Sequence, residues 1–310
     1  MVESIPKVVV IGGATAVGKS SLAVRLAQRT AGEIVNADSM QVYRGMDIGT
    51  AKPTKQERGG VPHYLLDLVD PDERFNAALF VAHAVPVIEE LHRQGRPCFL
   101  VGGSGLYIKA LEGGLFECPP NPPGLRERLR GEWEALGGQI LHRRLAALDP
   151  EAAERIHPND RVRILRALEV IELTGEPFSR RAERHGFNRQ RFKMLKVCLF
   201  RDRNELYQRI DHRTVEMMRR GLVEETQRLL ERGFGPELKP MNALGYRHAV
   251  SYLRGGMGIE EATERLKTDT RRYAKRQLTW FRGDEQWDWR RPGEEGLILD
   301  LIEDFYERDA

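Results

Sequence analysis

Short runs of apolar residues alternate along the chain with amphipathic stretches of helical length. Val8–Ile11 is a run of four β-branched apolar residues, which predicts a buried strand. Further strands are predicted at Glu33–Ala37, Arg96–Val101, Met194–Phe200 and Gln286–Trp289. Helices are predicted over Ser20–Gln28, Ala77–Gln94, Asn204–Arg220, Glu260–Phe281 and Leu297–Tyr306. Strands that alternate with helices predict an α/β fold, a parallel sheet flanked by helices.

One purely helical segment interrupts this alternation. It begins at Cys118–Pro123, where four prolines in six residues exclude both helix and sheet. Helices are then predicted over Leu125–Leu136, Leu141–Leu148 and Arg161–Leu173, the last capped by Asn159 and Asp160. We therefore predict a core of residues 1–121 and 191–310, with an all-helical insertion domain over 122–190.

The first predicted strand runs into a glycine-rich turn that opens the first helix. The turn has the pattern G-x-x-x-x-G-K-S, formed by Gly13, Ala14, Thr15, Ala16, Val17, Gly18, Lys19 and Ser20. This is the spacing of the phosphate-binding P-loop, in the required strand–loop–helix context. Backbone N–H groups and Lys19 would hold an anion there, and the Ser20 hydroxyl could ligate Mg²⁺. The fold is thus predicted to be P-loop NTPase-like, similar to nucleotide kinases.

Asp38 directly follows the second predicted strand. Ligands of open parallel sheets bind at the carboxyl ends of strands, so Asp38 and the P-loop should share one crevice. A carboxylate beside a phosphate site can hold Mg²⁺ or accept a proton from a nucleophile. The alternative is an ordinary turn or helix-capping aspartate.

Two further loops are candidates for binding. Tyr43–Pro53 lacks periodicity and is rich in polar residues, so it either binds a ligand or forms a surface Ω-loop. Gly102, Gly103 and Gly105 surround Ser104 at the end of the third strand. Either a ligand approaches this backbone closely, or the glycines serve a tight turn.

Charge is distributed unevenly along the 310 residues, although the net charge is only +3. Phe178–Arg220 holds 13 basic and 5 acidic residues, including Arg209 and Arg213 on one helix face. Arg265–Arg282 carries seven basic residues and one acidic residue, interleaved with Tyr273, Trp280 and Phe281. Such a surface suits RNA, with aromatic rings that stack on unpaired bases. The alternatives are a solvated basic face and aromatic rings that belong to the core.

The three cysteines, Cys98, Cys118 and Cys198, are too few and too scattered for a disulfide framework or a zinc site. Residues 1–7 lack the apolar segment of a signal peptide, and no run approaches the ~18 apolar residues of a membrane span. We therefore expect a cytoplasmic protein with reduced thiols. No strong interface stripe is present, so we expect a monomer.

Three kinds of protein could combine a P-loop with a basic helical surface. A small-molecule P-loop kinase with a helical lid accounts for Gly13–Ser20 and Asp38, but it leaves the basic helices unexplained. A non-catalytic RNA-binding module accounts for the helices, although Lys19, Ser20 and Asp38 are all intact. An enzyme that acts on RNA accounts for both features.

The chain resembles the bacterial tRNA dimethylallyltransferases, also called tRNA isopentenyltransferases or the IPP transferase family. The matching stretches are GATAVGKSSLA, NADSMQVYRGMDIGTAKP, PHYLLDLVDP, LVGGSGLY, IHPNDRVRILRALEV, ALGYRH and KRQLTWFR. They occur in the family's order and span nearly the whole chain. The second is the most specific, because kinases do not share it. Ala14 departs from the family, which usually has proline there.

The resemblance implies a chemistry for these residues. The P-loop would hold the diphosphate of dimethylallyl diphosphate with Mg²⁺, and the acceptor would be the exocyclic N6 amine of the adenosine 3′-adjacent to the anticodon. Asp38 would accept the proton, while Lys19, Thr15 and Arg213 would stabilise the departing diphosphate. The implied tRNA contacts are Asp38, Ser39, Met40, Gln41, Ser104, Arg126, Asn159, Asp160, Arg161, Val162, Arg163, Asn242, Ala243, Leu244, Gly245, Tyr246, Arg247, Arg271, Arg272, Lys275, Arg276, Gln277 and Thr279.

Overall fold

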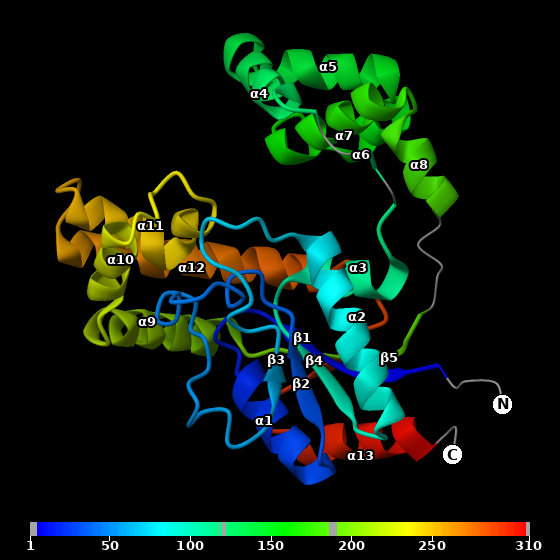
Figure 1. The fold of residues 1–310 in the computed structure, drawn as a ribbon, viewed down its shortest axis with the longest axis vertical. Coiled ribbons are helices and arrows are strands. Elements are labelled where there is room, and N and C mark those ends of the chain that lie inside the picture. The colour runs from blue at the N-terminus through cyan, green and yellow to red at the C-terminus, as the bar shows by residue number, and fades with distance from the viewer. Residues whose placement is uncertain (1–4, 117, 120–121, 186–190, 308–310) are drawn as a thin grey trace. The chain divides into compact units, whose positions relative to one another are not determined.

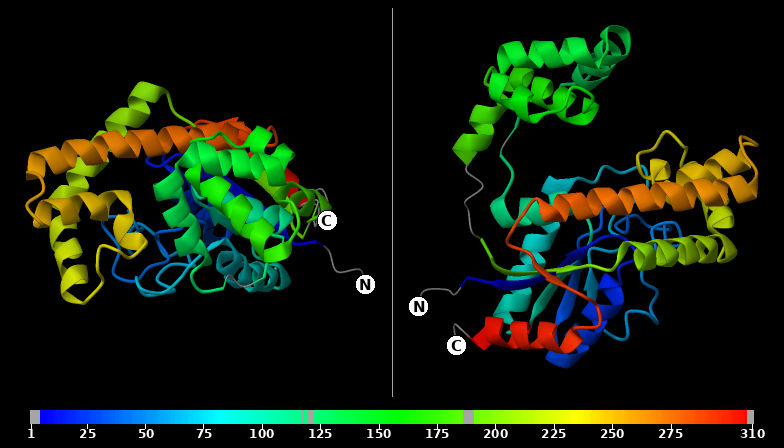
Figure 2. Two further views of the ribbon diagram at one scale, coloured as in Figure 1. Left: turned by 90° about the horizontal axis from the view of Figure 1, so that it is seen from above. Right: turned by 180° about the vertical axis from the view of Figure 1, so that it is seen from behind.

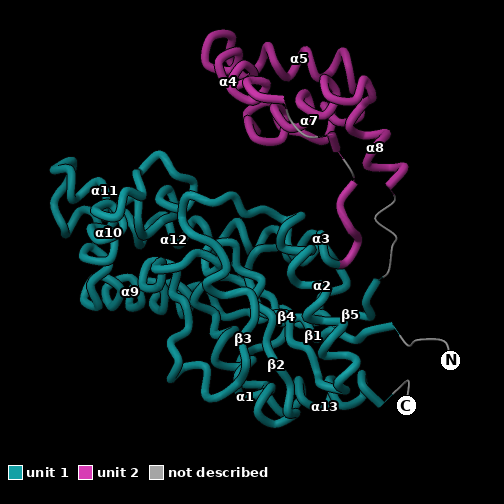
Figure 3. Tube along the Cα trace, in the orientation of Figure 1, with its two compact units in different colours: residues 1–111, 191–310 teal, residues 112–190 magenta. Residues whose placement is uncertain are grey.

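The computed structural model describes residues 5–116, 118–119, 122–185 and 191–307 (Figure 1). The chain divides into unit 1, residues 1–111 with 191–310, and unit 2, residues 112–190 (Figure 3). Unit 2 therefore begins ten residues before the predicted insertion. Within this stretch, Phe116 packs edge-to-face on Phe178, with ring centroids 5.5 Å apart. The proline-rich segment predicted as the boundary lies partly outside the described residues.

Unit 1 is built on a parallel sheet, which has six strands within the described residues. Their order is β3-β2-β4-β1-β5-β6. The strands are β1 (Lys7–Gly13), β2 (Glu33–Asn36), β3 (His63–Tyr64), β4 (Cys98–Val101), β5 (Lys193–Leu199) and β6 (Asp288–Arg290). β1 lies in the interior, with Val9 opposite Phe99 of β4 and Leu195 of β5. The sheet thus resumes at β5 after the insertion, which confirms the predicted α/β class.

Successive side chains of β1 enter two different cores, because side chains alternate between the faces of a strand. Val9 and Ile11 pack with α1 (Lys19–Thr30) and α13 (Glu295–Glu307). Val8 and Val10 pack with α2 (Ala77–Arg93) and α3 (Gly105–Gly113). Helices therefore cover both faces of the sheet (Figure 1). This layering leaves the carboxyl ends of β1, β2 and β4 to carry loops.

The C-terminal part of unit 1 adds a group of helices beside the sheet. They are α9 (Arg203–Arg219), α10 (Leu222–Glu231), a 3-10 turn (Pro240–Asn242), α11 (Leu244–Leu253) and α12 (Ile259–Arg282). The long α12 packs against α9 and α11 (Figure 2). Phe281 of α12 is fully buried against Trp280 and Trp287, so this aromatic residue belongs to the core. Among the described helices, none has the length and apolarity that crossing a lipid bilayer requires.

Unit 2 is helical throughout its described residues. Its helices are α4 (Leu125–Leu136), α5 (Gly138–Leu148), α6 (Pro150–Arg155), α7 (Arg161–Thr174) and α8 (Phe178–His185). They enclose a separate core that includes Leu129, Leu145 and Leu168. Asp160 caps α7 as predicted, because its Oδ1 accepts the Arg163 N–H at 3.1 Å. The insertion therefore has an apolar core of its own.

Candidate active site

The predicted P-loop connects β1 to α1. Gly13 and Gly18 adopt φ angles of 133° and 110°, which side-chain-bearing residues rarely adopt. A Cβ on Gly13 would also lie 2.6 Å from the Leu199 carbonyl oxygen. Lys19 folds back over the loop and donates from Nζ to the carbonyl oxygens of Gly13 at 3.0 Å and Ala14 at 2.8 Å. The ammonium group is thereby held at the mouth of the phosphate site.

Burial disfavours the charged form of Lys19. It lowers the pKa of the ammonium group to about 8; Asp38 opposes this change and Arg213 adds to it. A bound anion would restore the charge, so diphosphate binding and protonation of Lys19 should be coupled.

Diphosphate affinity should therefore fall at alkaline pH. With a pKa of about 8, Lys19 is charged at pH 7 and loses its proton progressively above pH 8. The Kd for inorganic pyrophosphate, measured by calorimetry, should rise by up to about tenfold per pH unit from pH 8 to 10. The arginine in Lys19→Arg stays charged over this range. The Kd of this variant should therefore lack the rise of up to about tenfold per pH unit. Equal slopes in the two proteins would refute the coupling.

Three arginines hold the P-loop from the side of β5 and α9. Arg213 donates from Nη2 to the Thr15 hydroxyl, and Arg209 donates from Nε to the Ala16 carbonyl at 2.9 Å. Arg201 donates to the Val17 carbonyl at 2.8 Å. Burial lowers the pKa of Arg213 to about 10, and Asp38 partly offsets this effect. The predicted shared face of Arg209 and Arg213 thus contacts consecutive P-loop residues.

Asp38 lies in the same crevice as the P-loop, as predicted. Lys19, Ser20, Asp38 and Arg213 all line one cavity of about 490 Å³. Asp38 also fulfils the turn role that was the alternative, because its Oδ1 accepts the backbone N–H groups of Met40 at 2.8 Å and Gln41 at 3.4 Å. The turn fixes the carboxyl group while one of its oxygens serves the local backbone.

The glycines at the end of β4 serve internal packing, which favours the second of the two interpretations. A Cβ on Gly102 would lie 2.1 Å from the Ala37 carbonyl oxygen, and one on Gly105 would lie 2.3 Å from the Trp280 ring. Between them, Ser104 accepts the Ser39 N–H on its Oγ at 3.0 Å. This turn therefore packs against Ala37, which precedes Asp38, and accepts a hydrogen bond from Ser39, which follows it.

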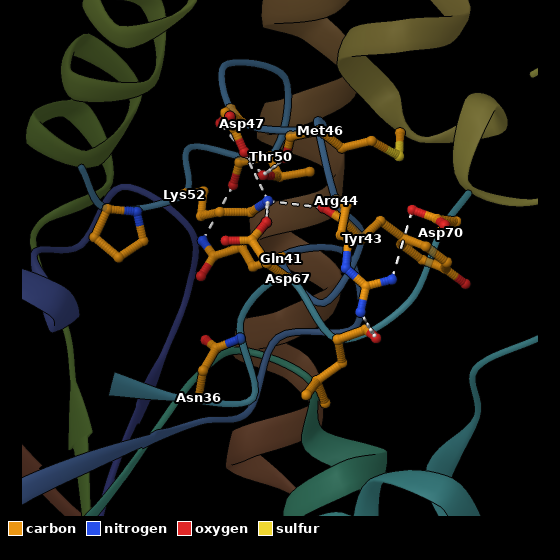
Figure 4. A network of polar contacts seen from close by, with 12 residues as sticks. Asn36, Gln41, Tyr43, Arg44, Met46, Asp47, Thr50, Lys52, Asp67 and Asp70 are labelled. Atoms are coloured by element: carbon orange, nitrogen blue, oxygen red, sulfur yellow. Dashed lines mark hydrogen bonds and ion pairs between the residues drawn. The ribbon is translucent and has the colours of Figure 1, made fainter. Parts of the chain in front are cut away.

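The loop over residues 43–53 is ordered by two buried charged side chains, Lys52 and Glu225. Figure 4 shows Lys52 among its partners. Lys52 donates from Nζ to the Tyr43 carbonyl and to Asp47 at 2.7 Å each, and to Asp67 at 2.5 Å. The Glu225 carboxylate accepts the N–H groups of residues 47–49 at 2.9 to 3.1 Å. The sequence singled out neither charge, because Glu225 is far from the loop in sequence and Lys52 is one of several polar residues within it.

Loss of the Glu225 carboxylate should destabilise unit 1. Glu225→Ala would leave three N–H groups and the Tyr246 hydroxyl, which donates to it at 2.7 Å, without their acceptor. We expect the free energy of unfolding to fall by about 3 kcal/mol in urea titrations. Glu224→Ala, at an exposed position beside it, should change the value by less than about 0.5 kcal/mol. Similar losses in both variants would contradict this role.

The residues expected to contact tRNA differ in exposure and in the contacts that they make within the protein. Several are exposed, namely Asn159, Val162, Arg163, Asn242, Arg247, Arg272, Lys275, Arg276 and Thr279, and of these Arg163 pairs with Asp160 while Arg247 and Arg272 pair with Asp269. Others are held by the protein: Arg126 pairs with the buried Glu169, and Arg271 pairs with Asp211. Tyr246 and Gln277 are buried, so any effect of theirs on RNA would be transmitted through the segments that they hold. The individual RNA contacts remain predictions.

The oxygen ligands around the P-loop fit a magnesium ion that shares its coordination with a diphosphate. Ser20 is exposed and lines the cavity together with the Asp38 carboxylate. Mg²⁺ in such sites takes few protein ligands, because phosphate oxygens and water complete its shell. Within the described part of the chain, His, Cys, Asp and Glu side chains form no cluster of three that could hold a metal without substrate.

Comparisons with known proteins point to one family. The family model described as IPP transferase matches residues 41–284. A tRNA dimethylallyltransferase of Syntrophobacter fumaroxidans is 52% identical over 282 residues, which cover 91% of this chain and 82% of that protein. A tRNA isopentenylpyrophosphate transferase structure from Bacillus halodurans aligns with a TM-score of 0.72 and 41% identity over 97% of both chains.

A third comparison extends the likeness to eukaryotes. The structure of a eukaryotic dimethylallyltransferase acting on tRNA aligns with a TM-score of 0.73 and 33% identity, over 89% of this chain and 69% of that one. The phosphate-binding loop, the adjoining Asp38 and the helical insertion all lie within a match of nearly the full length of the chain. The chain belongs to the IPP transferase family.

Proposed function

We propose that this protein is a tRNA dimethylallyltransferase. It transfers a dimethylallyl group from dimethylallyl diphosphate to the N6 amine of the adenosine at tRNA position 37, 3′-adjacent to the anticodon, in tRNAs that read codons beginning with U. Diphosphate is released. The observation that carries the proposal is the shared cavity, in which Asp38 faces the same space as Lys19 and Arg213. Family membership is consistent with dimethylallyl diphosphate and tRNA as the two substrates. It disfavours the kinase alternative.

The donor half of the reaction needs stabilisation of a polyanionic leaving group. As the carbon–oxygen bond breaks, its electron pair moves onto the diphosphate. Lys19 and Arg213 line the cavity that would hold the diphosphate and would stabilise this negative charge, and Thr15 is held by Arg213. Preorganised donors of this kind typically contribute 10²–10³-fold to the rate. Mg²⁺ held by Ser20 would add positive charge beside the diphosphate.

The acceptor half needs a base beside an extruded adenine. The N6 lone pair forms the new carbon–nitrogen bond, and the amine then loses one proton to Asp38. Oδ1 of Asp38 already accepts the N–H of Met40, which leaves Oδ2 for this proton. An anticodon-loop base must leave its stack to reach the cavity, at a cost of a few kcal/mol. Base catalysis by a positioned carboxylate contributes about 10²–10⁴-fold.

The RNA would be held by basic surfaces on both units. In unit 1, Arg272, Lys275 and Arg276 form the exposed side of α12, opposite its buried face. In unit 2, Arg161–Arg163 begin α7, where the Asp160 cap fixes the start of the helix. Phosphate contacts of this type make affinity fall as salt rises.

One assay separates the candidate functions. The protein is incubated with labelled dimethylallyl diphosphate, unmodified tRNA and Mg²⁺, beside a parallel reaction with labelled ATP. Prenyl transfer to the tRNA is expected, and it should require all three components. Phosphoryl transfer without prenylation would overturn the proposal in favour of a kinase. RNA binding without any transfer would overturn it in favour of a binding module.

A further inference from the structure

Gln277 joins segments of the active site that are far apart in sequence. Its side chain is 7% exposed and lies on the buried face of α12, between Ala274 and Phe281. Oε1 accepts the backbone N–H of Thr15 at 2.8 Å, and Nε2 donates to the carbonyl oxygen of Gly103 at 3.0 Å. The two partners lie 262 and 174 positions away in the chain. One amide therefore spans two loops of the cavity.

These two loops carry the two halves of the proposed chemistry. Thr15 belongs to the P-loop, and its hydroxyl accepts a hydrogen bond from Arg213. Gly103 precedes Ser104, whose hydroxyl oxygen accepts the Ser39 N–H beside Asp38. The amide thus links the diphosphate side of the cavity to the side that holds the base.

The chemistry of the bridge suits an amide. It needs an acceptor for one N–H and a donor for one carbonyl oxygen, and the side-chain amide of glutamine carries both on one carbon atom. Packing around the amide is close, because a Cβ on Gly103 would lie 2.3 Å from Nε2. The N–H of Thr15 is also committed to Gln277 rather than to a phosphate.

We infer that Gln277 is a positioning residue for the proposed transfer, and that it contacts no RNA. It fixes Thr15 against Arg213 and holds the Gly103–Ser104 turn next to Asp38. The inference rests on the proposed function. It assigns the two faces of α12 different roles, since Lys275 and Arg276 remain on the exposed side for RNA.

Gln277→Met tests the role, because methionine has a similar length without either polar group. At saturating tRNA and donor, kcat should fall at least tenfold while the Kd for tRNA stays within twofold of the wild-type value. Lys275→Met should give the opposite pattern, a raised KM for tRNA. Glu264→Gln, at an exposed position on the same helix, should behave as wild type. A weakened tRNA Kd with unchanged kcat would overturn the inference.

A double-mutant cycle distinguishes positioning from a general loss of stability. If Gln277 acts through Thr15, Gln277→Met should raise the Kd for inorganic pyrophosphate at least threefold in the wild-type background and much less in a Thr15→Val background. Effects that multiply independently would overturn the inference. The pyrophosphate measurement needs no turnover. It therefore tests the inference even if the wild-type protein transfers no prenyl group, a result that would overturn the proposed function instead.

Discussion

Replacing Asp38 by asparagine should lower kcat for prenyl transfer at least 100-fold without impairing diphosphate binding. The amide oxygen can still accept the Met40 N–H at the position of Oδ1, so the turn should persist. The amide cannot take the proton of the attacking amine, and the contribution of the base is lost. Asp38 also stabilises the charges of Lys19 and Arg213. Removal of its negative charge leaves the phosphate site more positive.

The two effects should have opposite signs, which makes the result diagnostic. Single-turnover rates with tRNA should drop in Asp38→Asn, while the Kd for inorganic pyrophosphate at pH 7 should stay unchanged or become lower. Asp72→Asn removes a carboxylate at an exposed position and should match wild type in both assays. Unchanged turnover in Asp38→Asn would eliminate this residue as the base. Parallel losses of turnover and pyrophosphate binding would indicate a structural role.

Arg213→Gln should lower kcat by about 10²–10³-fold, because the guanidinium acts on charge that develops in the transition state. The effect on the donor KM should be smaller than the effect on kcat. Arg213 also lowers the pKa of Lys19, so its loss should raise that pKa. The pH at which pyrophosphate affinity begins to fall should therefore move above about 8 in the variant.

Arg219→Gln is the matched control, since Arg219 lies on the same helix at an exposed position. It should leave both the rate and the pH profile unchanged. A purely structural Arg213 would give a different result: the free energy of unfolding would fall, while the pH profile of the folded protein would keep its wild-type midpoint.

The parts of the site that could be predicted are those whose chemistry is local in sequence. The glycines of the P-loop, Lys19 and Ser20 follow a buried strand directly, so eight consecutive residues determine the anion site. Asp38 follows the next strand, and the topology of parallel sheets places it in the same crevice. The first strand was predictable because Val8–Ile11 is a run of β-branched apolar residues, which is typical of a buried strand.

Some elements escaped prediction because their stretches carry no clear local signal. β3 is two residues long, and α3 follows a glycine-rich turn that reads as a loop. Their stability comes from packing: Tyr107 of α3 stacks on Phe80 of α2, with ring centroids 4.5 Å apart. Tertiary contacts of this kind leave no periodic signal in the chain.

The sequence by itself determined the phosphate loop, the neighbouring carboxylate and the alternation of strands and helices, because each depends on adjacent residues. Only the tertiary structure decided how these pieces are held. Glu225 orders a loop 176 to 178 positions away, and Gln277 bridges residues 262 and 174 positions away. A buried polar group needs a hydrogen-bond partner, and the fold often supplies one from a distant segment. The role of such a group therefore depends on the packing of distant segments, and its neighbours in sequence do not reveal it.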